Sequence, residues 1–215
     1  NTWNDASTGM ERAIVYSLII DPKTPTTLYA VTYEGFFKTI NGGEEWRSLN
    51  AGLNDIKVES LTVDPITPSN LYVLTPFGVY KSIDGGEKWT ESKTGLEDFQ
   101  IASLAVDPTE PTTLYGISFD GIVKSTNGGE SWNKIHVDTH IFPGAMLINP
   151  ITPTTFYVAS SDGLFISTNS GATWTEANIG SNVRGVLSLA IDPISLSNLY
   201  VGTGFGGGVY KSVNG

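Results

Sequence analysis

One stretch decides the fold of this chain: Ser82-Ile83-Asp84-Gly85-Gly86-Glu87-Lys88-Trp89. Tryptophan recurs at a fixed interval on either side of it. The five tryptophans are 43, 43, 43 and 42 residues apart, at Trp3, Trp46, Trp89, Trp132 and Trp174. A constant period in this range is the signature of a repeat architecture. Residues that recur in every repeat therefore belong to the scaffold, and we expect functional residues where the repeats differ.

A single repeat shows the pattern of four short strands. Lys57–Val63 alternates between polar and apolar residues, which predicts the first strand. The loop Asp64–Asn70 contains two prolines, which cannot donate ladder hydrogen bonds. Three further strands are predicted at Leu71–Thr75, at Val79–Ile83 and from about Trp89 onward. Each repeat is therefore expected to form one antiparallel sheet.

Sheets repeated in this way predict an all-β fold, a five-bladed β-propeller of four-stranded antiparallel blades. One such sheet exposes both faces, so it has to stack on its neighbours, and radial stacking gives a propeller. A β-sandwich is the alternative, but it does not require the same turn chemistry five times. We expect a single domain over residues 1–215, with blades at about 13–50, 56–93, 101–137, 144–178, and 185–215 together with 1–7.

The two ends of the sequence predict how the ring closes. Ser212-Val213-Asn214-Gly215 reads as the first half of the repeated turn, and Asn1-Thr2-Trp3 reads as its second half. We therefore expect the N-terminal strand to pair with the C-terminal blade, because this removes the seam between first and last blades. Two alternatives stay open. The chain is a fragment of a longer propeller, or the Trp3 strand pairs with the next molecule and gives a filament.

The repeated turn resembles the Asp box, or BNR repeat, S/T-x-D/N-x-G-x-x-W. We call these stretches box turns; the complete ones are Thr39–Trp46, Ser82–Trp89, Ser125–Trp132 and Ser167–Trp174. In such a turn the Asp or Asn side chain caps backbone amides, glycine adopts positive φ, and the hydroxyl and the indole lock the hairpin. The resemblance implies a structural role for Asn41, Trp46, Asp84, Trp89, Asn127, Trp132, Asn169, Trp174, Asn214 and Trp3.

The wider repeat reads S-L-x-V/I-D-P-x-x-P-x-x-L-Y, followed by G-x-x-K-S-x-D-G-G-x-x-W. It resembles the repeats of family 74 xyloglucan hydrolases, sortilin-type receptors and photosystem II assembly factors. These groups perform unrelated functions, so the resemblance implies a scaffold and does not select a function.

The composition argues against several classes of protein. Twenty-two acidic residues against 12 basic ones give a formal charge of −10, which argues against nucleic-acid binding. The absence of cysteine removes disulfides, thiol catalysis and thiolate metal sites. The apolar runs are too short to span a bilayer. We expect no cofactor, no membrane insertion, and an extracellular, cell-surface or periplasmic location.

Candidate ligand-binding residues lie in the turns between second and third strands, on the face opposite the box turns. These turns vary among the repeats and carry Tyr33, Glu34, Phe77, Phe119, Asp120, Asp162 and Phe205. Exposed aromatic rings beside carboxylates are suited to a carbohydrate or a peptide. The alternative is that each aromatic side chain fills a gap between blades.

The third-to-fourth blade connection departs from the repeat. Asp138 replaces the glycine found six residues after the other tryptophans, and one residue is deleted. If extended, His136, Asp138 and His140 would point the same way, which is geometrically compatible with a metal. No fourth ligand is suggested, so we predict solvated loop residues and no metal site.

Enzymatic activity is the less favoured prediction. A sialidase needs an arginine cluster, and only Arg12, Arg47 and Arg184 are present. A glycoside hydrolase needs two carboxylates flanking the scissile bond, and Glu34, Asp120 and Asp162 are the candidates. We predict a non-catalytic binding or self-assembling structural module whose partner is a protein, a second copy of the chain or a carbohydrate. The alternative is a glycoside hydrolase-like enzyme.

Overall fold

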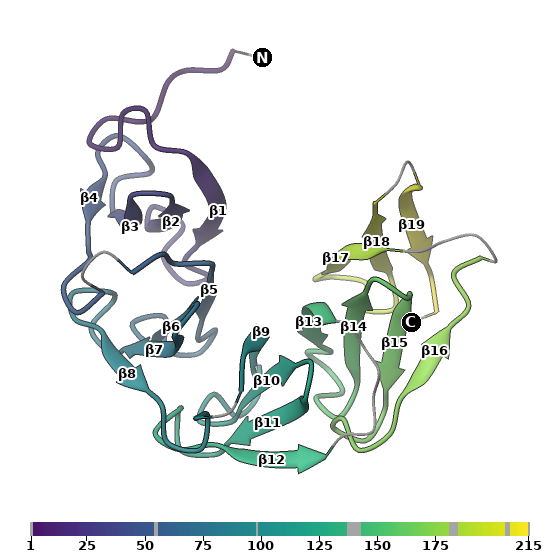
Figure 1. Ribbon diagram of the computed structural model, residues 1–215. Helices are drawn as coiled ribbons and strands as arrows, with labels where there is room; N and C mark the ends of the chain where they lie inside the picture. Colours follow the sequence, from purple (N-terminus) through teal and green to yellow (C-terminus); the bar gives the residue numbers. More distant parts are fainter. Residues whose placement is uncertain are drawn as a thin grey trace. The chain divides into compact units, whose positions relative to one another are not determined.

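The computed structural model describes residues 2–53, 56–97, 99–136, 143–180, 185–204 and 207–214. Within these ranges the regular secondary structure consists entirely of strands, which form five antiparallel sheets (Figure 1). Strands that are consecutive in the sequence are neighbours in each sheet. This confirms the predicted fold class, a five-bladed β-propeller in which each sheet is one blade. No described part of the chain forms a helix with the length and apolar character needed to cross a membrane.

The chain divides into two compact units, Asn1–Lys93 and Thr94–Gly215. The first unit contains two four-stranded sheets. One has the strands β1 (Val15–Ile20), β2 (Leu28–Thr32), β3 (Gly35–Thr39) and β4 (Arg47–Ser48). The other has β5 (Ser60–Val63), β6 (Leu71–Thr75), β7 (Gly78–Ser82) and β8 (Thr90–Ser92).

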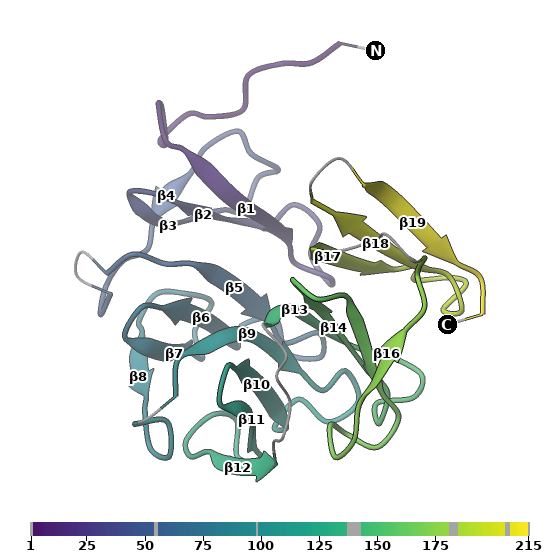
Figure 2. The same cartoon turned by 45° about the vertical axis from the view of Figure 1, so that its right-hand side comes forward.

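The second unit contains three sheets (Figure 2). The first is formed by β9 (Ile101–Val106), β10 (Leu114–Ser118), β11 (Gly121–Ser125) and β12 (Asn133–His136). The second is formed by β13 (Pro143–Ile148), β14 (Phe156–Ser160), β15 (Leu164–Ser167) and β16 (Thr175–Ala177). The last contains the three strands β17 (Val186–Ile191), β18 (Leu199–Thr203) and β19 (Gly208–Ser212).

The proline-containing loops are held by a side-chain turn that recurs in each blade. Asp64 Oδ1 accepts hydrogen bonds from the backbone N–H groups of Ile66 and Thr67, both at 2.8 Å. An Asp side chain that binds its own backbone two residues on makes a tight turn without a ladder bond. The same pair of bonds is made by Asp21, Asp107, Asn149 and Asp192.

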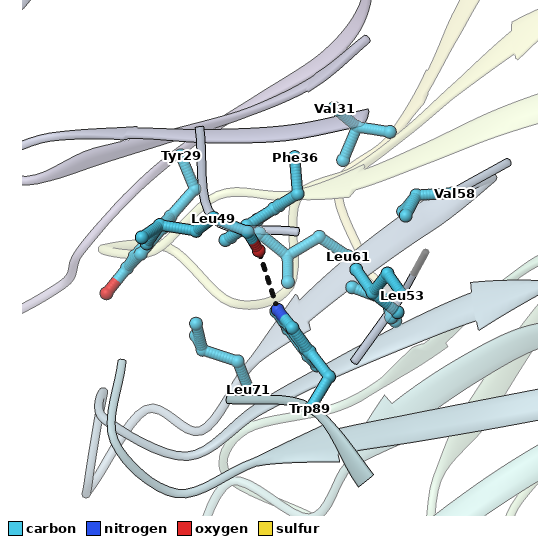
Figure 3. Close-up of a cluster of buried hydrophobic side chains, with 10 residues drawn as sticks. Tyr29, Val31, Phe36, Leu49, Leu53, Val58, Leu61, Leu71 and Trp89 are labelled. Atoms are coloured by element: carbon cyan, nitrogen blue, oxygen red, sulfur yellow. Dashed lines mark hydrogen bonds between the residues drawn. The ribbon is translucent and has the colours of Figure 1, made fainter. Parts of the chain in front are cut away.

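The apolar core lies between stacked sheets. In the first unit, side chains of both sheets form one cluster, drawn in Figure 3. It consists of Tyr29, Val31, Phe36, Leu49, Leu53, Val58, Leu61, Leu71, Val73 and Trp89. The Phe36 and Trp89 rings meet edge to face, with centroids 5.2 Å apart. Burying this apolar area is what holds one blade on the next, as the sheet pattern requires.

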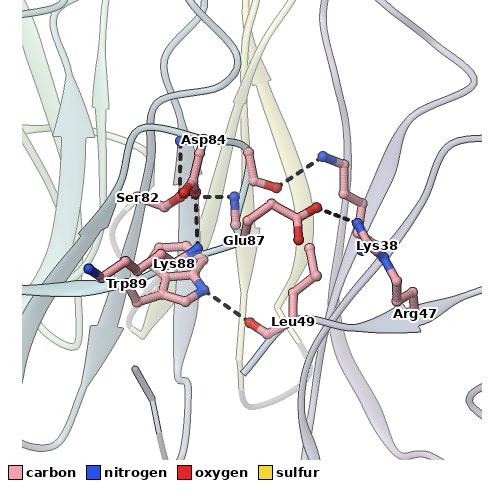
Figure 4. Close-up of polar contacts among 10 residues, drawn as sticks. Lys38, Arg47, Leu49, Ser82, Asp84, Glu87, Lys88 and Trp89 are labelled. Atoms are coloured by element: carbon pink, nitrogen blue, oxygen red, sulfur yellow. Dashed lines mark hydrogen bonds and ion pairs between the residues drawn. The ribbon is translucent and has the colours of Figure 1, made fainter. Parts of the chain in front are cut away.

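The box turns contain the hydrogen bonds that the sequence predicts for their polar residues. In the second blade the Ser82 hydroxyl donates to Asp84 Oδ1 at 2.7 Å, and the Lys88 N–H donates to the same oxygen at 3.0 Å (Figure 4). The Gly86 N–H donates to Ser82 Oγ at 2.9 Å. Equivalent bonds to the Asn or hydroxyl oxygens are made in the turns of Asn41, Asn127 and Asn169.

In two of the box turns the indole N–H group is bonded outside its own turn. Trp46 Nε1 donates to Ala6 O at 2.8 Å and Trp89 Nε1 donates to Leu49 O at 3.1 Å, so each indole binds the connection that precedes its blade. Each of these two tryptophans therefore ties its blade to the preceding repeat. The indole N–H group has a hydrogen-bond acceptor because the preceding connection lies beside it.

Trp174 differs from Trp46 and Trp89. Its Nε1 donates to Gly171 O at 3.1 Å, within its own box turn, as the sequence analysis expects. The connection that precedes this blade is the one that carries Asp138 in place of glycine. The segment 137–142 lies outside the described residues, so the role of Asp138 stays a prediction.

The N-terminal residues are separate from the sheets. Thr2–Ser7 belongs to no strand, and the Trp3 side chain is 99% exposed. The Ala6 carbonyl is nevertheless fixed, because it accepts the Trp46 indole N–H. Closure of the propeller by pairing of the N-terminal strand with the C-terminal blade stays a prediction.

Candidate functional site

The turns between the second and third strands place aromatic rings in solvent. A hydroxyl at the end of the second strand fixes each turn; Thr32 Oγ donates to Gly35 O at 3.0 Å and accepts the Glu34 N–H at 3.1 Å. Thr75 and Ser118 make the same donor bond across their turns. These turns therefore have a rigid frame although their tips differ in sequence.

The aromatic side chains at these tips do not fill gaps between blades. Tyr33 is 67% exposed, Phe77 73% and Phe119 55%, so the gap-filling alternative is wrong for these three. Phe205 lies outside the described residues. Asp120 and Asp162 are exposed, with their backbone N–H groups bound to Ser118 Oγ and Ser160 Oγ, each at 3.2 Å.

Two of the predicted residues line a pocket of about 670 Å³ in the first unit. It opens between the β2–β3 turn and the connection that follows β4. Its lining comprises Tyr33, Glu34, Gly35, Asn50, Leu53, Ile56 and Lys57. Leu53 is 1% exposed and forms an apolar base, whereas Tyr33, Glu34 and Lys57 are exposed. The pocket thus combines an aromatic ring, a carboxylate and an ammonium group above an apolar base.

Asn50 joins the two walls of this pocket. Its Oδ1 accepts the Phe36 N–H at 2.8 Å, and its Nδ2 donates to Ser48 Oγ at 3.0 Å and to Glu34 O at 3.4 Å. Gly35 makes room for this amide, because a Cβ on Gly35 would lie 2.4 Å from Asn50 Nδ2. Asn50 and Gly35 together therefore set the position of the turn that carries Tyr33 and Glu34.

Most backbone N–H groups around the pocket already have partners inside the protein. Tyr33 N donates to Ile14 O at 3.1 Å, Leu53 N to Asn50 O at 2.8 Å and Ile56 N to Leu53 O at 2.7 Å. With the Glu34 and Phe36 N–H groups also bound, little main chain is left to pair with an added strand. Recognition in this pocket therefore falls to the side chains of Tyr33, Glu34 and Lys57.

Most of the residues that line the pocket are not among the site residues predicted from the sequence. Asn50, Leu53, Ile56 and Lys57 come from the connection between the first two blades, whereas only the turn residues Tyr33 and Glu34 are predicted. The available signal was the position of such connections on the same face as the turns. Asp120 and Asp162 do not line this pocket among the described residues, so their grouping with Glu34 stays a hypothesis.

The absence of a metal site at His136, Asp138 and His140 stays a prediction. Asp138 and His140 lie outside the described residues, and for His136 only the backbone is described. Among the side chains that are described, no group of three His, Asp or Glu residues is arranged to hold a metal ion.

Tyr29, Tyr72 and Lys38, whose pKa values are shifted, belong to the scaffold. Burial, with a further contribution from Asp21, raises the pKa of Tyr29 to about 12. Burial and Asp64 do the same for the pKa of Tyr72 at the equivalent position. Burial also lowers the pKa of Lys38, whose ammonium group lies 5.5 Å from the Tyr29 ring centroid and donates to Gly85 O at 3.0 Å.

Polar contacts also link the two sheets of the first unit on the box-turn side. Arg47 pairs with Glu87, and Lys38 reaches the Gly85 carbonyl of the adjacent box turn (Figure 4). Arg47 and Lys38 are thus engaged in holding the two blades of this unit together. The pocket of Tyr33, Glu34 and Lys57 lies at the other end of the strands β2 and β3.

Comparisons with known proteins show the fold. No protein-family model and no curated protein matches the chain. The chain is similar to the GH74 enzyme of Niastella koreensis, with a TM-score of 0.75 and 23% identity over 95% of this chain and 36% of that chain. It is also similar to YCF48 bound to D1 peptide, with a TM-score of 0.66 and 16% identity over 94% of this chain and 64% of that chain.

A third similar structure is an auxiliary nutrient binding protein from Bacteroides thetaiotaomicron. Its TM-score is 0.63 at 14% identity, over 92% of this chain and 56% of that chain. This chain spans about a third of the length of the GH74 enzymes. The resemblance to family 74 enzymes is thereby confirmed at the level of the fold, and at these identities it does not extend to the activity.

Proposed function

We propose that this chain is a non-catalytic binding module and that its ligand contacts the pocket of Tyr33, Glu34 and Lys57. The observation that carries the proposal is the exposed Tyr33 ring beside the Glu34 carboxylate, above the buried Leu53. An aromatic face offers stacking, while the two charged groups offer an acceptor and a donor. On the box-turn face, Arg47 and Lys38 are held by Glu87 and by the Gly85 carbonyl.

The chemistry of the pocket favours a neutral, polyhydroxylated ligand, that is, a saccharide. Lys57, whose ammonium group lies 3.9 Å from Glu59 Oε1, repels a cationic ligand, whereas Glu34 and the net charge of −10 repel an anionic ligand. Sugar hydroxyls use donors and acceptors together, and sugar rings stack on tyrosine. The internal partners of most N–H groups around the pocket support this choice over a peptide added as a strand.

A protein ligand is the second candidate. The structure of YCF48 with D1 peptide shows that a propeller of this fold accommodates a peptide. The exposed Tyr33, Phe77 and Phe119 suit apolar side chains of a partner. An extracellular, cell-surface or periplasmic location is part of the same proposal.

The number of carboxylates in the pocket favours binding over hydrolysis. A glycoside hydrolase uses two carboxylates, which lie about 5–10 Å from each other. Among the described residues that line the pocket, Glu34 is the sole carboxylate. The described lining thus supplies one carboxylate, which can bind and orient a sugar, and it supplies no pair of carboxylates for acid–base catalysis.

The test is titration calorimetry with a panel of neutral oligosaccharides, followed by Tyr33→Ala on any ligand that binds. We expect this substitution to weaken binding up to about tenfold, the scale of one aromatic contact. Phe77→Ala is the matched control, because Phe77 is equally exposed at the same turn of the next blade but does not line the pocket. An equal effect of both substitutions rejects the pocket. Hydrolysis of a bound oligosaccharide that Glu34→Gln abolishes rejects the non-catalytic assignment.

A further inference from the structure

Two of the complete box turns contain asparagine followed directly by glycine, at Asn41-Gly42 and at Asn127-Gly128. An asparagine loses its amide when the backbone nitrogen of the next residue attacks its side-chain carbonyl carbon. Glycine hinders this attack least, because it has no Cβ. The first pair lies in the first unit and the second pair in the second unit. Each unit therefore carries one complete box turn with a reactive sequence.

In both turns the attacking nitrogen is hydrogen-bonded to the proline-containing loop of its own blade. The Gly42 N–H donates to Thr26 O and the Gly128 N–H donates to Thr112 O, each at 2.8 Å. An amide nitrogen attacks only after it has lost its proton. A proton held in an internal hydrogen bond is lost to solvent when that part of the structure opens. The closed turn thus withholds the nucleophile.

The side-chain carbonyl of each asparagine is also held in place. Asn41 Oδ1 accepts the Thr39 hydroxyl at 2.7 Å and the N–H group four residues on at 3.1 Å. Asn127 Oδ1 accepts the Ser125 hydroxyl at 2.9 Å and the N–H group four residues on at 3.0 Å. Two bonds to one oxygen hold the side chain in one rotamer. The hydroxyls that make these bonds are buried, since Thr39 is 2% exposed and Ser125 0%.

We propose that Asn41 and Asn127 are deamidation sites that react only when their own turn opens. In the open turn the glycine nitrogen loses its proton and forms a bond to the asparagine Cγ, and the amide nitrogen leaves as ammonia. Water then opens the five-membered imide at one of its two carbonyl groups. The products are aspartate and isoaspartate, so the reaction consumes water and releases ammonia. Each site thus records irreversibly the opening of the blade in which it lies.

The two products differ in how they fit the turn. Asp84 stands at this position in the second blade, where its Oδ1 accepts the Ser82 hydroxyl at 2.7 Å and the Lys88 N–H at 3.0 Å. Aspartate therefore restores the turn. Isoaspartate adds a carbon atom to the main chain next to the bond from Gly42 N to Thr26 O, so the same set of bonds does not form again.

Asn169 in the fourth blade provides an internal control. Its Oδ1 accepts the Ser167 hydroxyl at 2.9 Å, and the Ser170 N–H donates to Thr154 O at 2.8 Å, so this turn is closed in the same way. The residue that follows Asn169 is serine, whose side chain hinders the attack. In the unfolded chain we therefore expect Asn169 to react more slowly than Asn127.

The test is peptide mapping by mass spectrometry after incubation of the full chain at mildly alkaline pH, with and without guanidinium chloride. Deamidation replaces an NH₂ group by OH, and the mass change assigns it to one peptide. We expect Asn41 and Asn127 to react at least about tenfold more slowly in the folded protein than in the unfolded chain, because protected amides open rarely. Equal rates in the two states overturn the proposal.

Two variants separate the opening of one turn from unfolding of the whole chain. Thr39→Val removes the hydroxyl that holds Asn41, and should accelerate the reaction of Asn41 alone. Ser125→Ala removes the hydroxyl that holds Asn127, and should accelerate the reaction of Asn127 alone. Thr39→Ser keeps the hydroxyl and should react like the wild type.

Circular dichroism establishes that each variant is folded before its rates are compared, and the wild-type comparison of folded and unfolded chain does not depend on the variants. A folded variant that accelerates both sites equally overturns the proposal, because the sites then report unfolding of the whole chain. A folded variant that accelerates neither site overturns it as well.

Discussion

Gly52 lies directly against Trp89. A Cβ on Gly52 would fall 2.4 Å from the Trp89 carbonyl oxygen, and the backbone of Gly52 has φ +94°. Gly9 and Gly95 approach Trp46 and Trp132 in the same way. This glycine, six residues after Trp3, Trp46 and Trp89, lets the connection between blades touch the tryptophan of the next repeat.

Gly52→Ala should therefore destabilise the fold more than an alanine at another positive-φ glycine. Gly42 is the control, with φ +75° and open space around its missing Cβ. We expect Gly42→Ala to cost about 1–2 kcal/mol from the backbone conformation alone. Gly52→Ala should cost at least about 2 kcal/mol more, because the clash is with rigid backbone. Urea unfolding of both variants measures the difference, and equal costs would show that the close approach is unimportant.

Trp89→Phe and Trp174→Phe should differ in their effect on stability. Trp89 is 3% exposed and its indole reaches the preceding connection, whereas Trp174 is half-buried and binds its own turn. We expect a loss of about 2–3 kcal/mol for Trp89→Phe and about 1 kcal/mol for Trp174→Phe. Chemical unfolding followed by circular dichroism measures both. A larger loss at Trp174 would contradict the assignment of Trp89 as the link between blades.

Acidification should weaken the box turn of Asp84. Hydrogen bonds from the Ser82 hydroxyl and the Lys88 N–H hold the pKa of the Asp84 carboxyl below its usual value. Since the folded-state pKa is the lower one, its contribution to stability is present above the unfolded-state pKa and lost as pH falls through the folded-state pKa. Asp84→Asn should thus lose less stability on acidification than the wild type. Unfolding free energies over a series of acidic pH values measure this, and parallel pH profiles would refute it.

Gly35→Ala should disturb the pocket, and Gly78→Ala should not. The two glycines stand at the same turn position with φ +127° and +128°, so their backbone costs are matched. A Cβ on Gly35 meets the Asn50 amide at 2.4 Å, whereas Gly78 has open space. We expect Gly35→Ala to be less stable than Gly78→Ala by about 1–2 kcal/mol, the cost of losing a partly buried hydrogen bond. Thermal unfolding compares them; similar melting temperatures would mean that Asn50 does not hold the turn.

The fold could be predicted from the sequence because the same pattern recurs in each repeat. The proline loops, the box turns and the alternating strands each recur in register, so four copies confirm what one copy suggests. The polar bonds within the box turn of Asp84 also follow from local turn chemistry. Tyr33 and Glu34 were identified because their turn varies while its neighbours do not.

The rest of the pocket depends on contacts that no local pattern specifies. Asn50 reaches Phe36 across 14 residues of sequence, and Leu53 joins the core through the stacking of two sheets. The acceptor of the Trp89 indole was missed for the same reason, because Leu49 belongs to the preceding repeat. Spacing reveals which residues recur but not which repeat each one touches.

The reach of Trp46 and Trp89 into the preceding repeat, 40 residues upstream in both cases, has an evolutionary consequence. When a gene segment encoding one whole repeat is duplicated or deleted, the new junction again brings a tryptophan to a connection of the same chemistry. Such an event changes the number of blades without leaving an unmatched contact at the join. Propellers of different size are in this way available to one lineage through recombination between its own repeats.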